Sequence, residues 1–138
     1  MAFSLHPSLA ADGPHIGNTA LCHVILRHDA RWPALILIPM RADCREVFDL
    51  SDADQRTLMA DVSMAARAIA QESKVTKVNI GALGNIVSQL HVHIVGRWPE
   101  DPEWPHPVWG RGSLEPYSTD ALEVVSRRLA ARMGLALG

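Results

Sequence analysis

Residues 89–95 most constrain the fold, because polar and apolar side chains alternate through the whole segment Gln-Leu-His-Val-His-Ile-Val. Successive side chains of an extended chain point to opposite faces, so the pattern predicts a strand with one buried and one polar face. The buried face would carry Leu90, Val92 and Ile94. The polar face would carry Gln89, His91 and His93, spaced about 7 Å apart. Surface strands often alternate in this way, but two imidazoles and an amide on one face, after a glycine-containing loop, indicate a functional site.

Three further segments are rich in β-forming residues and predict strands over 20–27, 34–38 and 75–80. Turn-forming residues at 29–33 separate the first two, which suggests a hairpin. The run Ala34–Ile38 is apolar at every position. Such a run suits a strand that is covered on both faces of its sheet.

Two helices are expected, the first from Ser51 to about Glu72. Ser51 can cap its first turn, with Asp54 three residues later. One apolar stripe follows at spacings of four, three and four, made of Leu58, Val62, Ala65 and Ile69. A second helix is predicted over 117–132 and ends near Gly134. Short strands with these helices predict an α+β domain on an antiparallel sheet.

Length, charge and cysteine content indicate what class of protein this is. The chain has 138 residues, no repeat and no linker, which fits one domain over 1–138. The net charge of −2 argues against bulk nucleic-acid binding, and no apolar run approaches the roughly 20 residues that span a bilayer. The first residues lack a basic leader and a sustained apolar stretch, so no secretion signal is expected, and Cys22 and Cys44 stand alone, as free thiols do in a reducing cytoplasm. A cytoplasmic location is therefore expected.

The segment around the paired histidines resembles the histidine triad (HIT) superfamily of nucleotide hydrolases and transferases. The family motif is His-x-His-x-His, where x is apolar. His91 and His93 match the second and third histidines, and Gln89 stands in the first position. The resemblance covers about residues 20–98.

Other parts of the chain extend this resemblance. His28-Asp29, followed by the apolar run that ends at Pro39, is similar to the first hairpin of the family. Asn79 occupies the family's Asn position, and Gly96-Arg97 continues the motif. The fold implied is a HIT-like antiparallel sheet of about five strands with one long helix between strands. A Trp/Pro-rich segment at 98–112 and a C-terminal helix at about 118–133 complete the expected domain.

The resemblance implies three catalytic positions. His91 would attack the α-phosphorus and form a nucleotidyl-histidine intermediate that water resolves. Its other ring nitrogen would donate to a backbone carbonyl, for which the carbonyl of Gln89 is the expected acceptor. His93 would contact the phosphate or the leaving group, and Gln89 would orient them. Gln89 cannot be protonated near neutral pH, so a proton relay through that position is missing, and we expect slower turnover than in family members that have His there.

The resemblance also implies a nucleotide-binding set, namely Asp29, Asn79, Gly84, Asn85, Ile86 and Val87. Asp29 would accept the ribose hydroxyls, and Asn79 would contact phosphate or ribose. Backbone amides of residues 84–87 would bind phosphate oxygens. Without the resemblance, Asp29 would be read as a turn residue, and Asn85 as part of a Gly-Asn turn. Ile86 stands where some members have a hydroxyl residue near the leaving group.

The expected substrate is a purine nucleoside phosphoramidate or a dinucleoside polyphosphate, handled by a homodimer. No cofactor is required, although a divalent metal could assist with a polyphosphate. Two alternatives stay open: a catalytically weak nucleotide sensor or adaptor, and a zinc protein that uses His91, His93 and His106. Three indoles, those of Trp98, Trp104 and Trp109, would close the base pocket, pack on the sheet or cover an interface.

Overall fold

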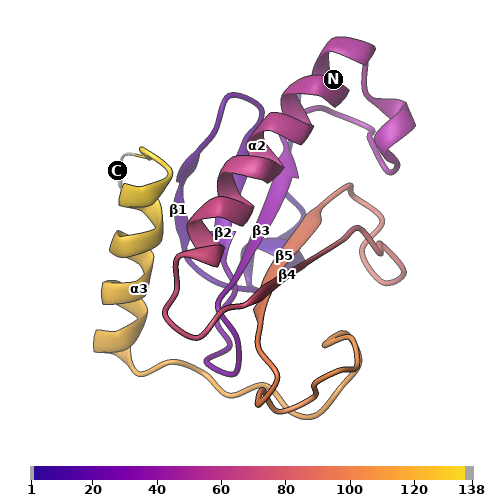
Figure 1. Cartoon of the computed structure of the whole chain (residues 1–138). Helices are drawn as coiled ribbons and strands as arrows, with labels where there is room; N and C mark the ends of the chain where they lie inside the picture. The colour runs from indigo at the N-terminus through magenta and orange to yellow at the C-terminus, as the bar shows by residue number, and fades with distance from the viewer. Residues whose placement is uncertain (1, 136–138) are drawn as a thin grey trace.

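Five antiparallel strands form a single sheet with the spatial order β1-β2-β3-β5-β4 in this computed structural model, which describes residues 2–135 (Figure 1). The strands are β1 (His15–Asn18), β2 (Cys22–Leu26), β3 (Ala34–Pro39), β4 (Lys77–Gly81) and β5 (Val92–Arg97). Because β5 lies between β3 and β4, His93 pairs with Ile36 on one side and Gly81 on the other. His93 therefore lies on an interior strand of the sheet.

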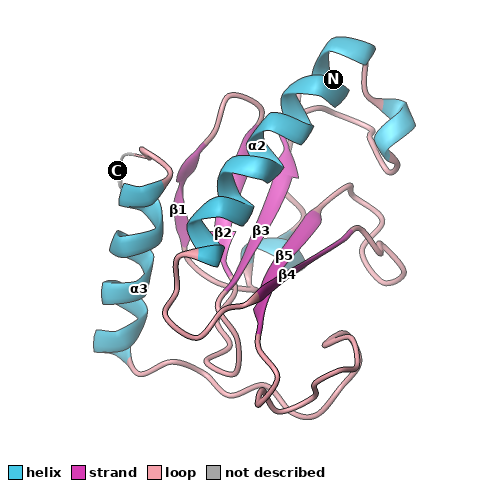
Figure 2. Ribbon diagram, viewed as in Figure 1, coloured by secondary structure: helices cyan, strands magenta, loops and turns pink. Residues whose placement is uncertain are grey.

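Two long helices confirm the expected α+β class: α2 (Asp52–Ala70) and α3 (Thr119–Arg132). The Ser51 hydroxyl accepts a hydrogen bond from the amide of Asp54, which is the predicted cap of α2. Two short elements accompany them, α1 (Pro7–Ala10) and a 3₁₀ turn, η1 (Val47–Asp49). Figure 2 shows that the segment between β5 and α3, which includes the Trp/Pro-rich residues, contains neither helix nor strand in the described chain.

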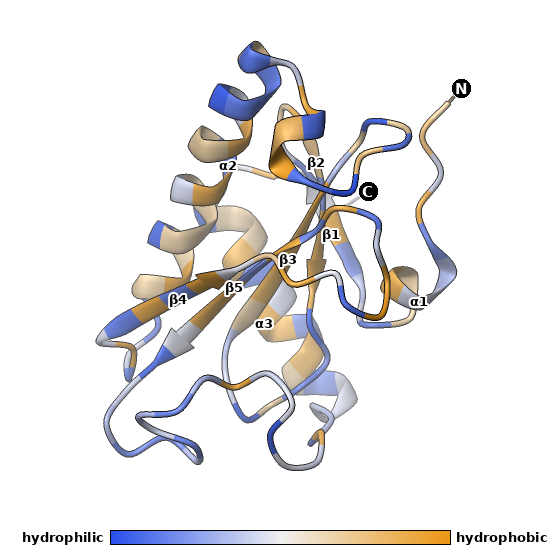
Figure 3. Ribbon diagram, turned by 90° about the vertical axis from the view of Figure 1, so that its right-hand side faces the viewer, coloured by the Kyte–Doolittle hydropathy of each residue, from blue (hydrophilic) through white to orange (hydrophobic). Residues whose placement is uncertain are grey.

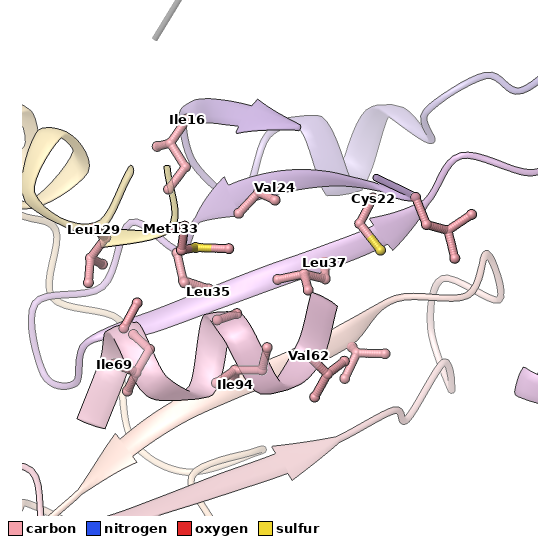
Figure 4. Packing of buried hydrophobic residues seen from close by; sticks show 14 of the residues in the cluster. Ile16, Cys22, Val24, Leu35, Leu37, Val62, Ile69, Ile94, Leu129 and Met133 are labelled. Atoms are coloured by element: carbon pink, nitrogen blue, oxygen red, sulfur yellow. The ribbon is translucent and has the colours of Figure 1, made fainter. Parts of the chain in front are cut away.

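The largest core cluster lies where α2 and α3 cover one face of the sheet (Figure 4). Leu35, Leu37 and Ile94 come from the strands, and Val62 and Ile69 come from α2. The predicted buried face of the histidine segment is confirmed, since Leu90, Val92 and Ile94 all belong to this cluster. Burial of these side chains is the main term that fixes the helices on the sheet.

The opposite face of the sheet carries two smaller apolar clusters. One joins Leu9 of α1 to Ile25, Ile36 and Ile38. The other consists of Trp32, Ala34, Val95 and Val108. Figure 3 shows α1 and α2 on opposite sides of the sheet. All six residues of β3 are buried, so the expectation of a strand covered on both faces is confirmed.

Two differences from the expected elements matter for the site. Strand β1 was not predicted; it has four residues, two of them Gly and Asn, and its pairing with β2 contains an irregularity between His15 and Gly17. Strand β5 begins at Val92 rather than at Gln89. The amide of Leu90 instead donates to the carbonyl of Cys44, so residues 89–91 have already left the sheet ladder.

Candidate active site

His91 and His93 border a cavity of about 540 Å³ on the face of the sheet opposite α2. Three parts of the chain complete its wall. The first is α1 with the turn after it, the second is the loop 83–87 between β4 and β5, and the third is Trp109 with Gly110. The volume falls within the range of small-molecule sites in proteins.

The imidazole of His91 is held in one tautomer. Its Nδ1 lies 2.7 Å from the backbone carbonyl oxygen of Gln89, and the residue is 7% exposed. A carbonyl oxygen only accepts, so Nδ1 must carry the proton and donate it. In the neutral ring, Nε2 then keeps its lone pair. The hydrogen bond expected between His91 and this carbonyl is present.

The ring of His93 lies next to that of His91, with centroids 5.1 Å apart and planes at 71°. Burial, reinforced by the positive potentials of His91 and Arg27, lowers the pKa of His93 to about 4. His93 is therefore neutral at neutral pH. Its Nδ1 is buried and has no hydrogen-bond partner among the described residues.

The side chain of Gln89 does not join the two histidines at the cavity. Its Oε1 accepts the amide of His6 and its Nε2 donates to the carbonyl of Ser4, both at 2.9 Å. The expected row of three polar side chains is thus wrong at its first member. The reason is that the Gln89 carboxamide pairs with the backbone of Ser4 and His6, a contact that the alternation of the segment does not reveal. Gln89 reaches His91 through its backbone carbonyl alone.

The loop before the histidines does reach the cavity as expected. Gly84, Asn85, Ile86 and Val87 all line it. Gly84 has φ +71°, a left-handed conformation that glycine adopts without steric cost and that turns the loop toward the histidines. Ile86 is 99% exposed, so its side chain is available to a ligand or a partner.

Asp29 and Asn79 lie outside the cavity wall. The Asp29 carboxylate, 2% exposed, forms a bidentate pair with the guanidinium of Arg31, at distances of 2.8 to 3.2 Å. Burial raises the pKa of Asp29, but hydrogen bonds from Arg31 and from the amide of Glu115 outweigh it and lower the pKa. The Asn79 side-chain oxygen accepts from Arg97 at 2.9 Å. Both side chains therefore serve contacts within the protein.

Six wall residues were outside the expected catalytic and nucleotide-binding sets: Ser8, Leu9, Asp12, Leu83, Trp109 and Gly110. A proline directly after a residue that can cap a helix is a signal for a helix start. Pro7 after His6 is such a signal and could have predicted α1. No local pattern points to Asp12. Burial raises the pKa of Asp12, against the opposing potentials of Arg27 and His91. Trp109 lies in the wall, whereas Trp98 packs against the cluster around Trp32 and Trp104 is 37% exposed.

The three-histidine zinc alternative is wrong for the part of the chain that the structure describes. No group of three or more His, Cys, Asp and Glu residues among residues 2–135 is placed to hold a metal ion. His106 therefore does not join His91 and His93. No helix within the same range is long and apolar enough to cross a membrane.

Comparison with known proteins identifies the family. Residues 10–100 match the model of the HIT domain, and the chain belongs to this family. A histidine triad protein from Sinorhizobium meliloti 1021 shares 44% identity, with coverage of 94% of this chain and 96% of that one and a TM-score of 0.91. One from Marinobacter aquaeolei VT8 shares 36% identity, with coverage of 99% and 100% and a TM-score of 0.93.

A curated relative adds information on activity. The AP-4-A phosphorylase of Mycobacterium tuberculosis is 36% identical over 73 residues, which are 49% of this chain and 37% of the relative. The chain thus spans little more than a third of that relative's length. Family membership and this match support a nucleotide-binding hydrolase or transferase as the general class.

Proposed function

We propose that the protein cleaves a purine nucleotide conjugate at the α-phosphate, with His91 as the nucleophile. The observation that carries the proposal is the hydrogen bond from His91 Nδ1 to the Gln89 carbonyl, because in the neutral ring it leaves the lone pair on Nε2, at a cavity of ligand size. A neutral nitrogen also approaches an anionic phosphate without the charge repulsion that a carboxylate would meet.

The reaction has two displacements. The Nε2 lone pair attacks the α-phosphorus, and the bond to the leaving group breaks; the leaving group departs with the electron pair and takes a proton from water. Water then attacks the nucleotidyl-histidine, the phosphorus–nitrogen electron pair returns to Nε2, and the water proton goes to solvent. His93, neutral near pH 7, would donate its N–H to the phosphate or the leaving group. Backbone amides of 84–87 would bind non-bridging oxygens.

We propose two substrate classes, nucleoside phosphoramidates and dinucleoside polyphosphates. The name of the Mycobacterium tuberculosis relative supports the second. No cofactor is needed, and a divalent ion would act only as a counter-charge for a polyphosphate. We further propose that the protein acts in the cytoplasm as a homodimer. The edge strand β4 supports the dimer, because Ile80 on it is 53% exposed.

Rapid quenching followed by intact-mass measurement tests the mechanism. The panel contains adenosine and guanosine phosphoramidates and dinucleoside polyphosphates. We expect a mass increase of one nucleoside monophosphate, absent in His91→Ala and retained in the control His106→Ala. His106 is exposed and does not line the cavity. Unchanged hydrolysis by His91→Ala would remove His91 from its role.

A second candidate is a nucleotide sensor or adaptor with negligible turnover. The engagement of the Gln89 amide with residues 4 and 6 favours it, because the first triad position then offers the substrate no proton donor. This candidate predicts binding of mononucleotides by the wild type without any adduct in the same mass measurement.

A further inference from the structure

We propose that Gln89 is a positioning residue that fastens the N-terminal segment, residues 4–12, into the wall of the cavity. The inference depends on the proposed function only for its kinetic consequences. The connection between Gln89 and this segment is a structural claim that can be tested without any substrate.

The Gln89 side chain binds the backbone of the N-terminal segment as a neighbouring strand would. One amide group satisfies both a donor, the N–H of His6, and an acceptor, the carbonyl of Ser4, at 2.9 Å each. These contacts join residues more than 80 positions apart in the sequence. A carboxamide can do this at every pH, because it carries a donor and an acceptor and does not titrate.

His6 connects the Gln89 hydrogen bonds to α1 through hydrogen bonds of its own. Its Nδ1 accepts the amide of Ser8 at 3.0 Å, and its carbonyl accepts the amides of Leu9 and Ala10 at 3.0 and 3.1 Å. Fixing His6 therefore fixes the first turn of the helix. The far end of the segment is held as well, since the amide of His28 donates to the carbonyl of Asp12 at 2.9 Å.

The segment held in this way supplies Ser8, Leu9 and Asp12 to the cavity. Leu9 is 2% exposed and packs on the sheet, so the short helix is seated by an apolar contact between its two polar attachments. A carboxylate repels phosphate but accepts hydrogen bonds from sugar hydroxyls. Asp12 thus suits the nucleoside end of a ligand, and displacement of the segment should weaken binding more than it slows the chemistry at His91.

The decisive variant is Gln89→Glu, which keeps the shape of the side chain. At pH 7 its carboxylate still accepts from His6 but has no donor for the Ser4 carbonyl. We expect the amides of residues 6 and 8–12 to lose about tenfold in hydrogen-exchange protection, as the loss of roughly one hydrogen bond implies.

Kinetics and a control complete the test. We expect Gln89→Glu and Gln89→Ala to raise KM about tenfold, with kcat within about threefold of the wild type. Gln71→Glu makes the same exchange at an exposed position after α2 and should change neither protection nor KM.

Three outcomes overturn the proposal. Full protection of residues 6–12 in both Gln89 variants would show that the amide does not hold the segment. Lost protection with unchanged KM would show that the segment is not part of the working site. A fall in kcat at constant KM would place Gln89 in the chemistry itself. If the wild type forms no adduct, the proposed function fails, whereas the exchange data and nucleotide binding still decide the role of Gln89.

Discussion

The ring of His93 packs edge to face against the indole of Trp109, with centroids 5.9 Å apart and planes inclined at 65°. The Nδ1 of His93 and the Nε1 of Trp109 are both buried, and neither has a hydrogen-bond partner within the described residues. This environment disfavours the imidazolium, and burial is the main cause of the lowered pKa of His93, about 4.

The first prediction is that His93 titrates near pH 4 in the folded protein. Its pKa in the unfolded chain is about 6.5. The unfolded state therefore takes up the proton first, and the free energy of unfolding should fall as the pH drops from about 6.5 to about 4. Two-dimensional NMR of the imidazole nitrogens, assigned with His93→Asn, measures the midpoint. A midpoint near 6.5 would contradict the buried, neutral ring, whereas bound nucleotide should shift the midpoint upward.

A second prediction concerns the contact between Gly81 and Trp109. A Cβ at Gly81 would lie 2.9 Å from Cη2 and 3.1 Å from Cζ2 of that indole, so the ring must shift in Gly81→Ala. Because Trp109 lines the cavity, we expect altered tryptophan emission and several-fold weaker nucleotide binding. The neighbouring exposed substitution Ala82→Ser also adds one heavy atom and should leave both unchanged. Wild-type emission and affinity in Gly81→Ala would argue against this contact.

The third prediction concerns the buried pair of Arg97 and Asp101, joined at 2.6 Å with side chains 1% and 0% exposed. Burial raises the pKa of Asp101, but hydrogen bonds from Arg97 and from backbone amides outweigh it and lower the pKa to about 2. The ionised carboxylate of Asp101 therefore stabilises the folded state. Its contribution to the free energy of unfolding is complete above about pH 4 and should be lost as the pH falls toward 2. Asp101→Asn leaves the guanidinium buried without its counter-charge and should cost about 3–5 kcal/mol in urea unfolding.

The exposed pair of Arg127 and Glu123, 2.7 Å apart on α3, is the matched control for that experiment. Glu123→Gln should change the urea midpoint little, because solvent screens such pairs. Equal effects of the two substitutions would show that burial does not strengthen the contribution of Arg97 and Asp101.

The fourth prediction separates stability from binding at Asp29. Asp29→Asn removes the charge that pairs with Arg31 and should lower the free energy of unfolding by about 1–3 kcal/mol. Nucleotide affinity should stay within about twofold of the wild type, since Asp29 does not line the cavity. Calorimetric titration beside urea unfolding measures both. Strongly reduced affinity at unchanged stability would restore Asp29 to the ligand site.

The features that the sequence predicted correctly depend on neighbours close in the chain. Alternation put Leu90, Val92 and Ile94 in the core, and the Ser51 cap marked the start of α2. The contacts that the sequence did not predict belong to side chains whose partners are set by tertiary packing. Gln89 turns to residues 4 and 6, which no local pattern connects to it. The Asp29 carboxylate accepts a hydrogen bond from the amide of Glu115. The orientation of this side chain is therefore set by a distant segment as well as by Arg31.

One face of the sheet carries the main hydrophobic core, and the other face carries the cavity. The large cluster beneath α2 and α3 involves neither His91 nor His93, and the cavity wall draws on loops and on the short helix of the other face. Changes in the loop 83–87 therefore leave the main core intact. Successive substitutions in this loop can change which ligand the cavity binds. Because they leave the main core intact, no compensating substitutions are needed to restore stability.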